Sequence, residues 1–392
     1  MLKVLLVFLL LVCHGSVMIA AYNRINATGL SRRFVKTVSK LMAVWTVVAP
    51  ILFYWTASHS WTNGIAADLS RGTLPVWQGI YLVAVVSCAA FMAIPWLLSR
   101  PILRLGWADH DEKSLRRYRV ASEVGAKLCR TRKCRRMAKV PGNDMLNLDI
   151  RQIDLAVPNL PPELKGYRIA HLSDFHLTGH IGPEFHRFAM DQAAAWEPEL
   201  IAVSGDLLDA AECLKWLPDI FGAATAPDGC HFILGNHDGR IGDVDPIRRR
   251  MSELGWNDVG GKMDAHRFRS HLGHIIGNEH PWYRRPTVAS GTNDDPSGFR
   301  LMISHSPDGW DFARDHGVHL TLAGHTHGGQ GRLPVIGPVL SPSRHGSRHA
   351  SGFFERNGHV LAVTRGVSGK HLLRIRCAPE ALLLRLVDAI SS

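Results

Sequence analysis

Apolar residues follow two different patterns along the chain. The first 100 residues contain three long apolar stretches, at 2–21, 41–57 and 74–98. Beyond residue 150 the apolar runs are short, and five of them end in a polar cluster; these runs are 167–172, 200–203, 232–234, 299–303 and 318–322. A membrane-spanning helix needs about 20 apolar residues, whereas short apolar runs are typical of buried strands. The pattern therefore predicts a membrane region at 1–100 and a folded domain at 151–392.

The strand-like runs of the second region alternate with helical ones. Helices are expected at 184–196, 212–223 and 244–254. A loop rich in Pro, Gly and Ser follows at 332–352, and the later strands are expected within 352–365, around an Asn357-Gly358 turn, and at 372–376 and 381–387, where they could close a second sheet. This alternation predicts an α/β (α+β) domain in which the carboxyl ends of parallel strands share one edge.

The three long apolar stretches differ in quality as membrane spans. The stretch 74–98 is amply long, 2–21 includes His14 and Gly15, and 41–57 is short and includes Pro50. Neighbouring helices can satisfy the backbone groups that such residues free. Tryptophans near the ends of the stretches, typical of membrane interfaces, favour three transmembrane helices; they are Trp55, Trp61, Trp77 and Trp96. The alternative is a pair of buried helices in a soluble protein.

Lys and Arg residues near the apolar stretches predict the orientation. Residues 22–40 carry five, residues 58–73 carry one and residues 99–120 carry six. Because basic loops stay in the cytoplasm, we expect three spans, an external N-terminus and a cytoplasmic folded domain at the inner membrane. In the alternative, residues 1–21 are a signal peptide cleaved near Ile19-Ala20-Ala21, and the domain is exported.

The net charge of +11 is unevenly distributed. Residues 1–150 hold 20 basic and 7 acidic side chains, and residues 151–392 hold 25 and 27. The basic run 127–136 follows the last apolar stretch, so 101–150 is interpreted as a basic juxtamembrane linker that meets the anionic phospholipid bilayer. No aromatic residues interleave the run, and we therefore expect no nucleic-acid partner. The seven cysteines form no evenly spaced framework, which favours reduced thiols, with palmitoylation open to Cys129 and Cys134.

Polar clusters rich in His, Asp and Asn follow the five short apolar runs. They are Asp174-Phe175-His176, Gly205-Asp206-Leu207-Leu208-Asp209, Gly235-Asn236-His237-Asp238, Ser304-His305-Ser306 and Gly324-His325-Thr326-His327. Oxygen and imidazole donors without cysteine favour hard to borderline divalent cations. In-line cleavage of a phosphoester is served by two such cations about 4 Å apart. We assign the bridging carboxylate to Asp206, because it is central in the set and Gly205 allows close backbone approach.

These segments match, in order, the D-x-H, G-D-x-x-D, G-N-H-[DE], lone His and G-H-x-H motifs, and the chain resembles the calcineurin-like metallophosphoesterases over about 167–365. The resemblance implies a four-layer αββα sandwich. It assigns one ion to Asp174, His176, Asp206 and His327, and the other to Asp206, Asn236, His305 and His325. It also implies that His237 acts as the acid, with Asp209 orienting its ring. Manganese is the expected metal, with iron, zinc or magnesium as alternatives.

Several residues near the motifs have more ordinary interpretations. Asp238 either orients a ligand or caps a helix before Gly239, and the cap is favoured. His180 and His186 follow the first motif and could face substrate, but a surface or packed histidine is favoured for each. A degenerate domain that binds metal without turnover is the alternative for the whole set.

The resemblance is greatest to a bacterial branch with membrane-associated phosphodiesterases and UDP-2,3-diacylglucosamine hydrolases. A domain tethered near the bilayer meets lipid headgroups at high effective concentration, so the expected substrate is a lipid-linked phosphodiester or pyrophosphate. The alternatives are soluble nucleotides or cell-envelope polymers, and a non-catalytic membrane sensor. The loop 280–286 has the composition of a lid, although an exposed turn has the same composition. No obligate protein partner is inferred.

Overall fold

The computed structural model describes residues 2–57, 76–98, 106–125, 127–287 and 298–388. The chain divides into two compact units, Met1–Leu105 and Gly106–Ser392.

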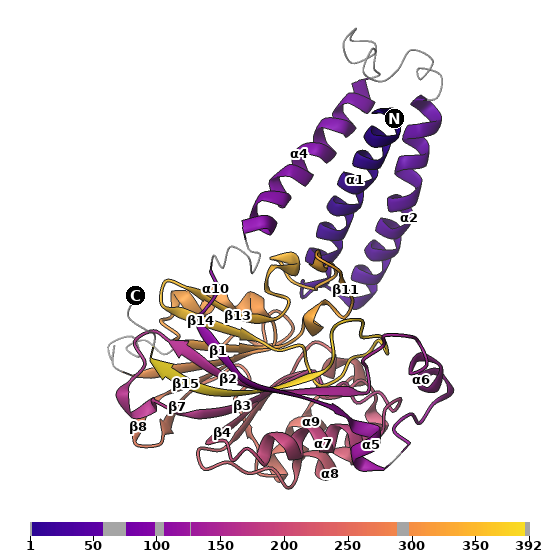
Figure 1. Cartoon of the computed structure of the whole chain (residues 1–392). Coiled ribbons are helices and arrows are strands. Elements are labelled where there is room, and N and C mark those ends of the chain that lie inside the picture. The colour runs from indigo at the N-terminus through magenta and orange to yellow at the C-terminus, as the bar shows by residue number, and fades with distance from the viewer. Residues whose placement is uncertain (1, 58–75, 99–105, 126, 288–297, 389–392) are drawn as a thin grey trace. The chain divides into compact units, whose positions relative to one another are not determined.

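The described part of the first unit contains the helices α1 (Leu2–Asn26), α2 (Arg32–Ala57) and α4 (Val76–Leu98), and α1 packs against both others (Figure 1). Within the described residues, Val7–Asn26 and Arg32–Phe53 are long and apolar enough to cross a membrane, and Val76–Met92 is a shorter apolar segment. The helices α1 and α2 extend past the predicted stretches, because part of the basic segment 22–40 is helical rather than a loop.

Polar residues of the first unit point towards neighbouring helices. His14 Nδ1 lies 2.8 Å from the Tyr81 hydroxyl, so α1 and α4 share a polar contact. The Phe53 ring contacts Trp77 and Tyr81 at centroid distances of 6.3 and 5.5 Å. Apolar side chains such as Leu41, Val44 and Ile51 remain exposed on α2, where a soluble helix would carry polar ones.

Two packed sheets form the centre of the second unit. The seven-stranded sheet has the order β1 (His110–Arg119), β2 (Asn147–Val157), β15 (Glu380–Asp388), β3 (Arg168–Leu172), β4 (Leu200–Ser204), β5 (Cys230–Ile233) and β6 (Asn257–Asp258). The six-stranded sheet has the order β13 (Gly352–Arg356), β14 (His359–Val363), β10 (Leu320–Ala323), β9 (Phe299–Ser304), β8 (His271–Asn278) and β7 (Met263–Phe268). A small hairpin pairs β11 (Arg332–Leu333) with β12 (Gly337–Pro338).

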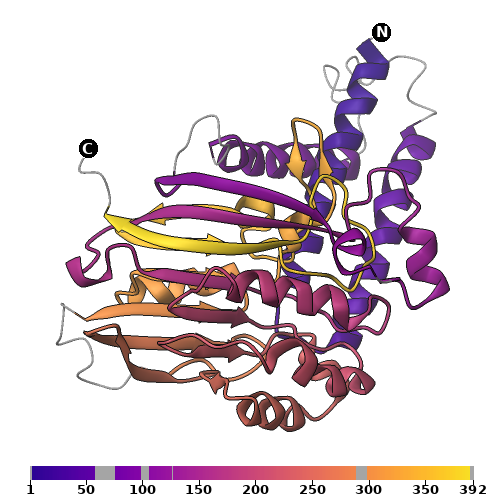
Figure 2. The ribbon, with the colours of Figure 1, turned by 60° about the horizontal axis from the view of Figure 1, so that its bottom comes forward.

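Helices cover the outer faces of these sheets. The α-helices of this unit are α5 (Val120–Val124), α6 (Arg132–Met137), α7 (Pro183–Ala194), α8 (Leu217–Phe221), α9 (Asp245–Glu253) and α10 (Trp310–Asp315). Among the residues that the structure describes, the short 3-10 helices are η1 (Pro162–Leu164), η2 (Ala211–Trp216), η3 (Asp238–Ile241), η5 (Pro307–Gly309), η6 (His327–Gly329) and η7 (Gly346–His349). Figures 1 and 2 show α7, α8 and α9 on one side of the seven-stranded sheet.

Three apolar clusters hold the layers together. One lies between the seven-stranded sheet and α7, α8 and α9, a second lies between the two sheets, and a third lies between the six-stranded sheet and α10. Neighbouring residues of one strand serve different clusters, as Ile201 and Ala202 of β4 do, because strand side chains alternate between faces. The predicted four-layer αββα sandwich is confirmed.

The five predicted motif strands are present as β3, β4, β5, β9 and β10. The turn at Asn357-Gly358 joins β13 to β14 as predicted. The run 381–387 lies in β15, which pairs with β2 and β3 in the seven-stranded sheet and not with β13 or β14. The run 372–376 is not a strand and makes only isolated bridges through Ile375. A local pattern identifies a strand but carries no information about its distant partner.

The region interpreted as a basic linker, 101–150, contributes to the folded unit. It contains β1, which is the edge strand of the seven-stranded sheet and pairs with β2 from His110 to Arg119. Its charges suit an exposed edge, since charged side chains discourage edge-to-edge association. Cys129 and Cys134 are joined by a disulfide, so the expectation of reduced thiols is wrong for this pair.

Candidate metal centre

The five motifs meet where strands of both sheets end. Motif residues follow β3, β4 and β5 in one sheet, which are parallel neighbours, and β9 and β10 in the other. Five of the expected ligands have left-handed backbone conformations, with φ between 46° and 70°; they are Asp174, His176, Asp206, His325 and His327. Non-glycine residues adopt such φ values at a cost, and they concentrate at functional sites.

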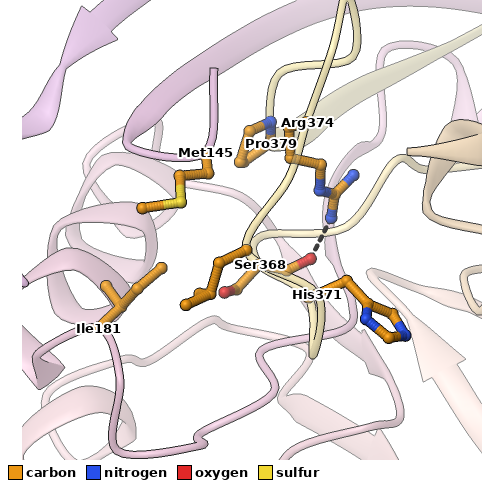
Figure 3. A pocket seen from close by; sticks show the side chains of 8 residues that line it. Met145, Ile181, Ser368, His371, Arg374 and Pro379 are labelled. Carbon is orange, nitrogen blue, oxygen red and sulfur yellow. Dashed lines mark hydrogen bonds between the residues drawn. The ribbon is translucent and has the colours of Figure 1, made fainter. Parts of the chain in front are cut away.

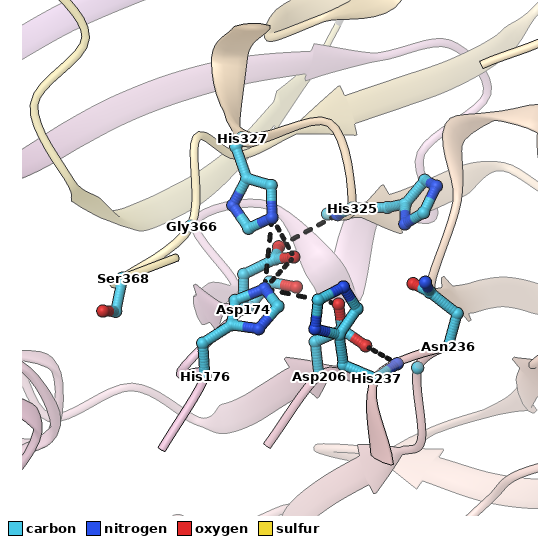
Figure 4. Close-up of polar contacts among 12 residues, drawn as sticks. Asp174, His176, Asp206, Asn236, His237, His325, His327, Gly366 and Ser368 are labelled. Atoms are coloured by element: carbon cyan, nitrogen blue, oxygen red, sulfur yellow. Dashed lines mark hydrogen bonds and ion pairs between the residues drawn. The ribbon is translucent and has the colours of Figure 1, made fainter. Parts of the chain in front are cut away.

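A first group of four side chains comprises Asp174, His176, Asp206 and His327, whose donor atoms all lie within 4.8 Å of one another (Figure 4). His176 Nε2 lies 3.1 Å from His327 Nε2 and 3.4 Å from Asp206 Oδ2. Asp174 Oδ1 lies 3.7 Å from His176 Nε2 and 3.6 Å from His327 Nε2. This is the first predicted ligand group.

A second group shares Asp206 with the first and adds His305 and His325. His305 Nε2 lies 3.4 Å from Asp206 Oδ1, 3.1 Å from Asn236 Oδ1 and 3.2 Å from His325 Nδ1. The structure thus brings together all seven predicted ligand side chains, and Asp206 is the carboxylate common to both groups. Gly205 is required here, because a Cβ at this position would lie 2.7 Å from His305 Nδ1.

The chemistry of these groups fits divalent cations. The buried oxygens Asp174 Oδ1 and Asp206 Oδ2 have no hydrogen-bond partner within the described part of the chain, although buried carboxylates normally have one. The other oxygens of these carboxylates accept hydrogen bonds from the backbone NH groups of His325 and His237, at 2.9 and 2.7 Å. One oxygen of each carboxylate is therefore held by the backbone, and the other faces imidazole nitrogens.

The electrostatics of the site reflect burial opposed by several carboxylates. Burial is the largest single effect and would lower the pKa of His176 and His305. Asp206, Asp174 and Asp209 together outweigh it and raise the pKa of His176 to about 10. Asp206 and Asp174, together with the Ser204 carbonyl, raise the pKa of His305 to about 9. The imidazoles in turn lower the pKa of Asp206 and Asp174 against the effect of burial. Ionised carboxylates are the form that binds cations.

Asp209 connects the first group to His237. Its carboxylate lies 2.6 Å from His176 Nδ1 and 2.6 Å from His237 Nδ1, and it accepts a hydrogen bond of 2.8 Å from Arg240. Arg240 also contacts His237 Nε2. Because arginine only donates, His237 Nε2 accepts, and His237 Nδ1 carries the proton that faces Asp209. From the sequence, Asp209 was expected to orient only the ring of His237. Its contacts with His176 and Arg240 were not predicted.

Asp238 does not cap a helix. The residue at the N-cap of η3 is His237, and the buried Asp238 carboxylate accepts hydrogen bonds of 2.8 Å from the NH groups of Leu208 and Gly235. It therefore ties together the loops of the second and third motifs, and the interpretation as a cap is wrong.

The two histidines after the first motif have structural surroundings. The buried His186 ring packs against Phe175 and Phe185, and burial lowers its pKa to about 3. His180 Nδ1 lies 3.0 Å from the Thr131 hydroxyl. The favoured interpretation of a packed histidine is confirmed for His186.

The loop 280–286 lies against the second ligand group. The ring centroid of Trp282 is 4.7 Å from that of His325 and 5.3 Å from that of His305. Buried Glu279 anchors the loop, because its carboxylate accepts a hydrogen bond of 2.7 Å from the Leu234 NH and pairs with Arg248 at 2.7 Å. The loop thus places Trp282 against the centre, whereas His280, Arg284 and Arg285 are exposed, as they would be in a surface turn.

Arg374 supports the first ligand group and was not singled out from the sequence. Its guanidinium is buried and donates to the carbonyl oxygens of His327 and Arg365, at 2.9 and 2.8 Å, and to that of Ser368. It also lines a small pocket with Met145, Ile181, Ser368, His371 and Pro379 (Figure 3). Arg374 and His327 are 47 positions apart in the sequence, so no local pattern reveals their contact.

Replacing Arg374 by methionine is expected to weaken metal binding about 10- to 100-fold, as the loss of groups that orient ligands does. The substitution keeps much of the volume but removes the buried donor shared by the carbonyl oxygens of His327, Arg365 and Ser368, so a lower melting temperature is also expected. Titration with Mn²⁺ and thermal unfolding measure the two effects. The exposed Arg376 provides a matched control in Arg376→Met, and equal metal affinity in the two variants would contradict the assignment.

The two ligand groups and the four-layer αββα sandwich together define a class of protein. Residues 167–329 match the calcineurin-like phosphoesterase family. The chain contains a calcineurin-like metallophosphoesterase domain and is a metal-dependent hydrolase.

The relatives of the chain include enzymes and membrane proteins. Phosphodiesterase YaeI of Escherichia coli (strain K12) is 28% identical, over 56% of this chain and 82% of that protein. UDP-2,3-diacylglucosamine pyrophosphatase LpxG of Chlamydia muridarum is 23% identical, over 61% of this chain and 89% of that protein. A transmembrane protein with metallophosphoesterase domain from Danio rerio is 22% identical, over 60% of this chain and 56% of that protein. Together with the two apolar helices, these relatives indicate a membrane protein.

Proposed function

We propose that the chain is a membrane-anchored phosphoesterase with two divalent cations, acting on a lipid-linked phosphodiester or pyrophosphate such as UDP-2,3-diacylglucosamine. The observation that carries the proposal is the pair of ligand groups that share Asp206. Hydrolysis of such a substrate by water would release UMP and a lipid phosphate. Similarity to a pyrophosphatase of this substrate supports the choice.

Two bound divalent cations supply a nucleophile at neutral pH and neutralise the charge of the phosphoryl oxygens. Asp174, His176, Asp206 and His327 would hold one cation, and Asp206, Asn236, His305 and His325 the other. His237 would donate a proton from Nε2 to the leaving oxygen, which requires Arg240 to release that nitrogen and Nε2 to be protonated first. Asp209 would hold the ring through its 2.6 Å contact with Nδ1. Manganese suits the oxygen and imidazole donors, as iron, zinc and magnesium do.

Three spans with an external N-terminus would place the catalytic domain in the cytoplasm of the producing cell, according to the distribution of basic residues. One observation favours a second candidate. Disulfides persist in oxidising compartments, and the bond between Cys129 and Cys134 thus favours an exported domain that acts on soluble nucleotides or envelope polymers. Proteolysis of spheroplasts from outside separates the candidates, since only an exported domain is cleaved.

The substrate is tested with the full-length chain in Mn²⁺-containing liposomes that carry radiolabelled UDP-2,3-diacylglucosamine. Release of UMP is expected, with kcat/KM at least about tenfold above that for a soluble nucleotide diester, because the anchored enzyme meets the lipid at high effective concentration. Asp206→Asn serves as the inactive control. A wild type that hydrolyses the soluble diester but releases no UMP from the lipid would overturn the proposed substrate.

A further inference from the structure

The hairpin of β11 and β12 presents a group of apolar side chains to the solvent. Val335 is completely exposed, and the exposed fractions of Leu333, Ile336 and Leu340 are 51%, 44% and 51%. Single exposed apolar residues are ordinary, but several together on one protrusion mark a site of interaction. We name residues 333–340 the apolar hairpin tip.

The backbone at the tip is strained. Val335 has φ of 63°, in the left-handed region. A β-branched residue rarely adopts this conformation, which costs of order 1–3 kcal/mol. The chain therefore accepts strain at the position where it exposes a valine completely, and an asparagine or glycine would fit the same turn without this cost.

The base of the hairpin is attached to the ligand loop. Arg332 donates to the Gly328 carbonyl oxygen at 3.0 Å, and its own backbone NH donates to Ile375 at 3.1 Å. A Cβ on Gly329 would lie 2.5 Å from the Pro338 Cβ, so the two segments are in close contact. Only a few residues separate the tip from His327, and any surface that holds the tip also holds the metal centre at a fixed distance.

The surroundings of the tip and the chain's connectivity identify the partner. Residues 316–354 contain three arginines and no aspartate or glutamate. Arg344 pairs with Asp308 and Asp311. No ion pair among the described residues neutralises Arg332 or Arg348, so the stretch keeps a positive charge that suits anionic headgroups. The last helix of the first unit ends at Leu98 and the second unit begins at Gly106. Seven residues span at most about 25 Å. A bilayer crossed by the helices would therefore lie within reach of the domain.

We propose that the apolar hairpin tip inserts into the interfacial layer of the lipid bilayer and holds the metal centre at headgroup level. The inference rests on the proposed membrane anchoring and deepens it, because it explains how a lipid-linked phosphate reaches the metal centre without leaving the bilayer. A polar anchor such as the basic run would keep the domain close but would not fix its orientation.

The test uses the full-length chain in liposomes of phosphatidylethanolamine and phosphatidylglycerol. An environment-sensitive fluorophore is attached to an azide side chain introduced at Val335, and separately at Leu272, an exposed apolar residue of the β7–β8 hairpin. A blue-shifted emission at 335, quenched about twofold or more by lipids with spin labels near the headgroup, is expected, whereas position 272 stays unquenched. Equal, water-like emission at both positions would overturn the proposal, and so would shielding at 335 without quenching by lipid, which indicates a protein contact.

A second measurement links the tip to turnover. The double variant Val335→Asp/Ile336→Asp is expected to lower kcat/KM for the liposome-borne substrate about tenfold, because two apolar side chains no longer enter the bilayer. Hydrolysis of soluble bis(p-nitrophenyl) phosphate is expected to stay unchanged, and Leu272→Asp provides the matched control. If the fluorophore at 335 is quenched by lipid but the wild type releases no UMP, insertion of the tip is supported and the proposed substrate is overturned. The two proposals can therefore be tested independently of each other.

Discussion

Asp206→Asn is expected to lower kcat/KM for bis(p-nitrophenyl) phosphate about a thousandfold, which corresponds to about 4 kcal/mol of transition-state stabilisation. Asp206 is the one carboxylate common to both ligand groups, with its two oxygens 3.4 Å from His176 Nε2 and His305 Nε2. A neutral amide offers one oxygen in place of two and removes the negative charge that the two ligand groups share. We therefore expect both a loss of turnover and a fall in bound metal.

The activity assay is combined with metal analysis by mass spectrometry of the purified full-length chain. Asp219→Asn is the matched control, because Asp219 is a half-exposed carboxylate paired with Arg187 on the surface. This control is expected to keep two metal ions per chain and wild-type activity. Full activity or unchanged metal content in Asp206→Asn would show that the two groups do not share a bridging ligand.

His237→Ala is expected to have an effect that depends on the leaving group. A general acid contributes about 10²–10⁴ in rate when the leaving oxygen must be protonated. For an alkyl phosphodiester we therefore expect a loss of about a thousandfold, and for bis(p-nitrophenyl) phosphate, whose leaving group needs no proton, a loss nearer to tenfold. Metal content should remain close to that of the wild type, because the His237 side chain belongs to neither bridged ligand group.

The measurement is the loss of kcat/KM caused by His237→Ala for a series of phosphodiesters whose leaving groups rise in pKa. The loss is expected to grow along the series. His180→Ala is the control histidine, since its ring contacts Thr131 and follows the first motif without belonging to a ligand group. A loss of the same size for both substrates would assign His237 a role in binding or in the structure rather than in proton donation. Structural damage can be told apart, because it would lower metal content as well.

The sequence alone predicted a set of metal-binding side chains, and the structure brings these side chains together. Each ligand follows a short apolar run, and such runs form buried strands whatever their partners are. The types of side chain then restrict the metal, and the order of motifs carries the resemblance to the family. The four-layer sandwich came from that resemblance and is confirmed by the three apolar clusters.

Other features could not be predicted from local patterns. The charged residues of β1 resembled a linker because an exposed edge strand and a solvated segment have similar composition. Asp238 resembled a helix cap because the same carboxylate can accept from its own turn or from a distant loop. The pairing of β15 with β2 and β3 depends on contacts between residues more than 200 positions apart.

What the sequence determined by itself is therefore the set of donors and the strands that carry them, because both are encoded within a few neighbouring residues. Only the tertiary structure decided which donors face one another, that Asp209 serves two histidines, that Arg374 supports His327 and that an apolar tip adjoins the ligand loop. The physical reason is that these arrangements depend on packing between distant segments, whose energies are set by the whole core and not by any local run of residues.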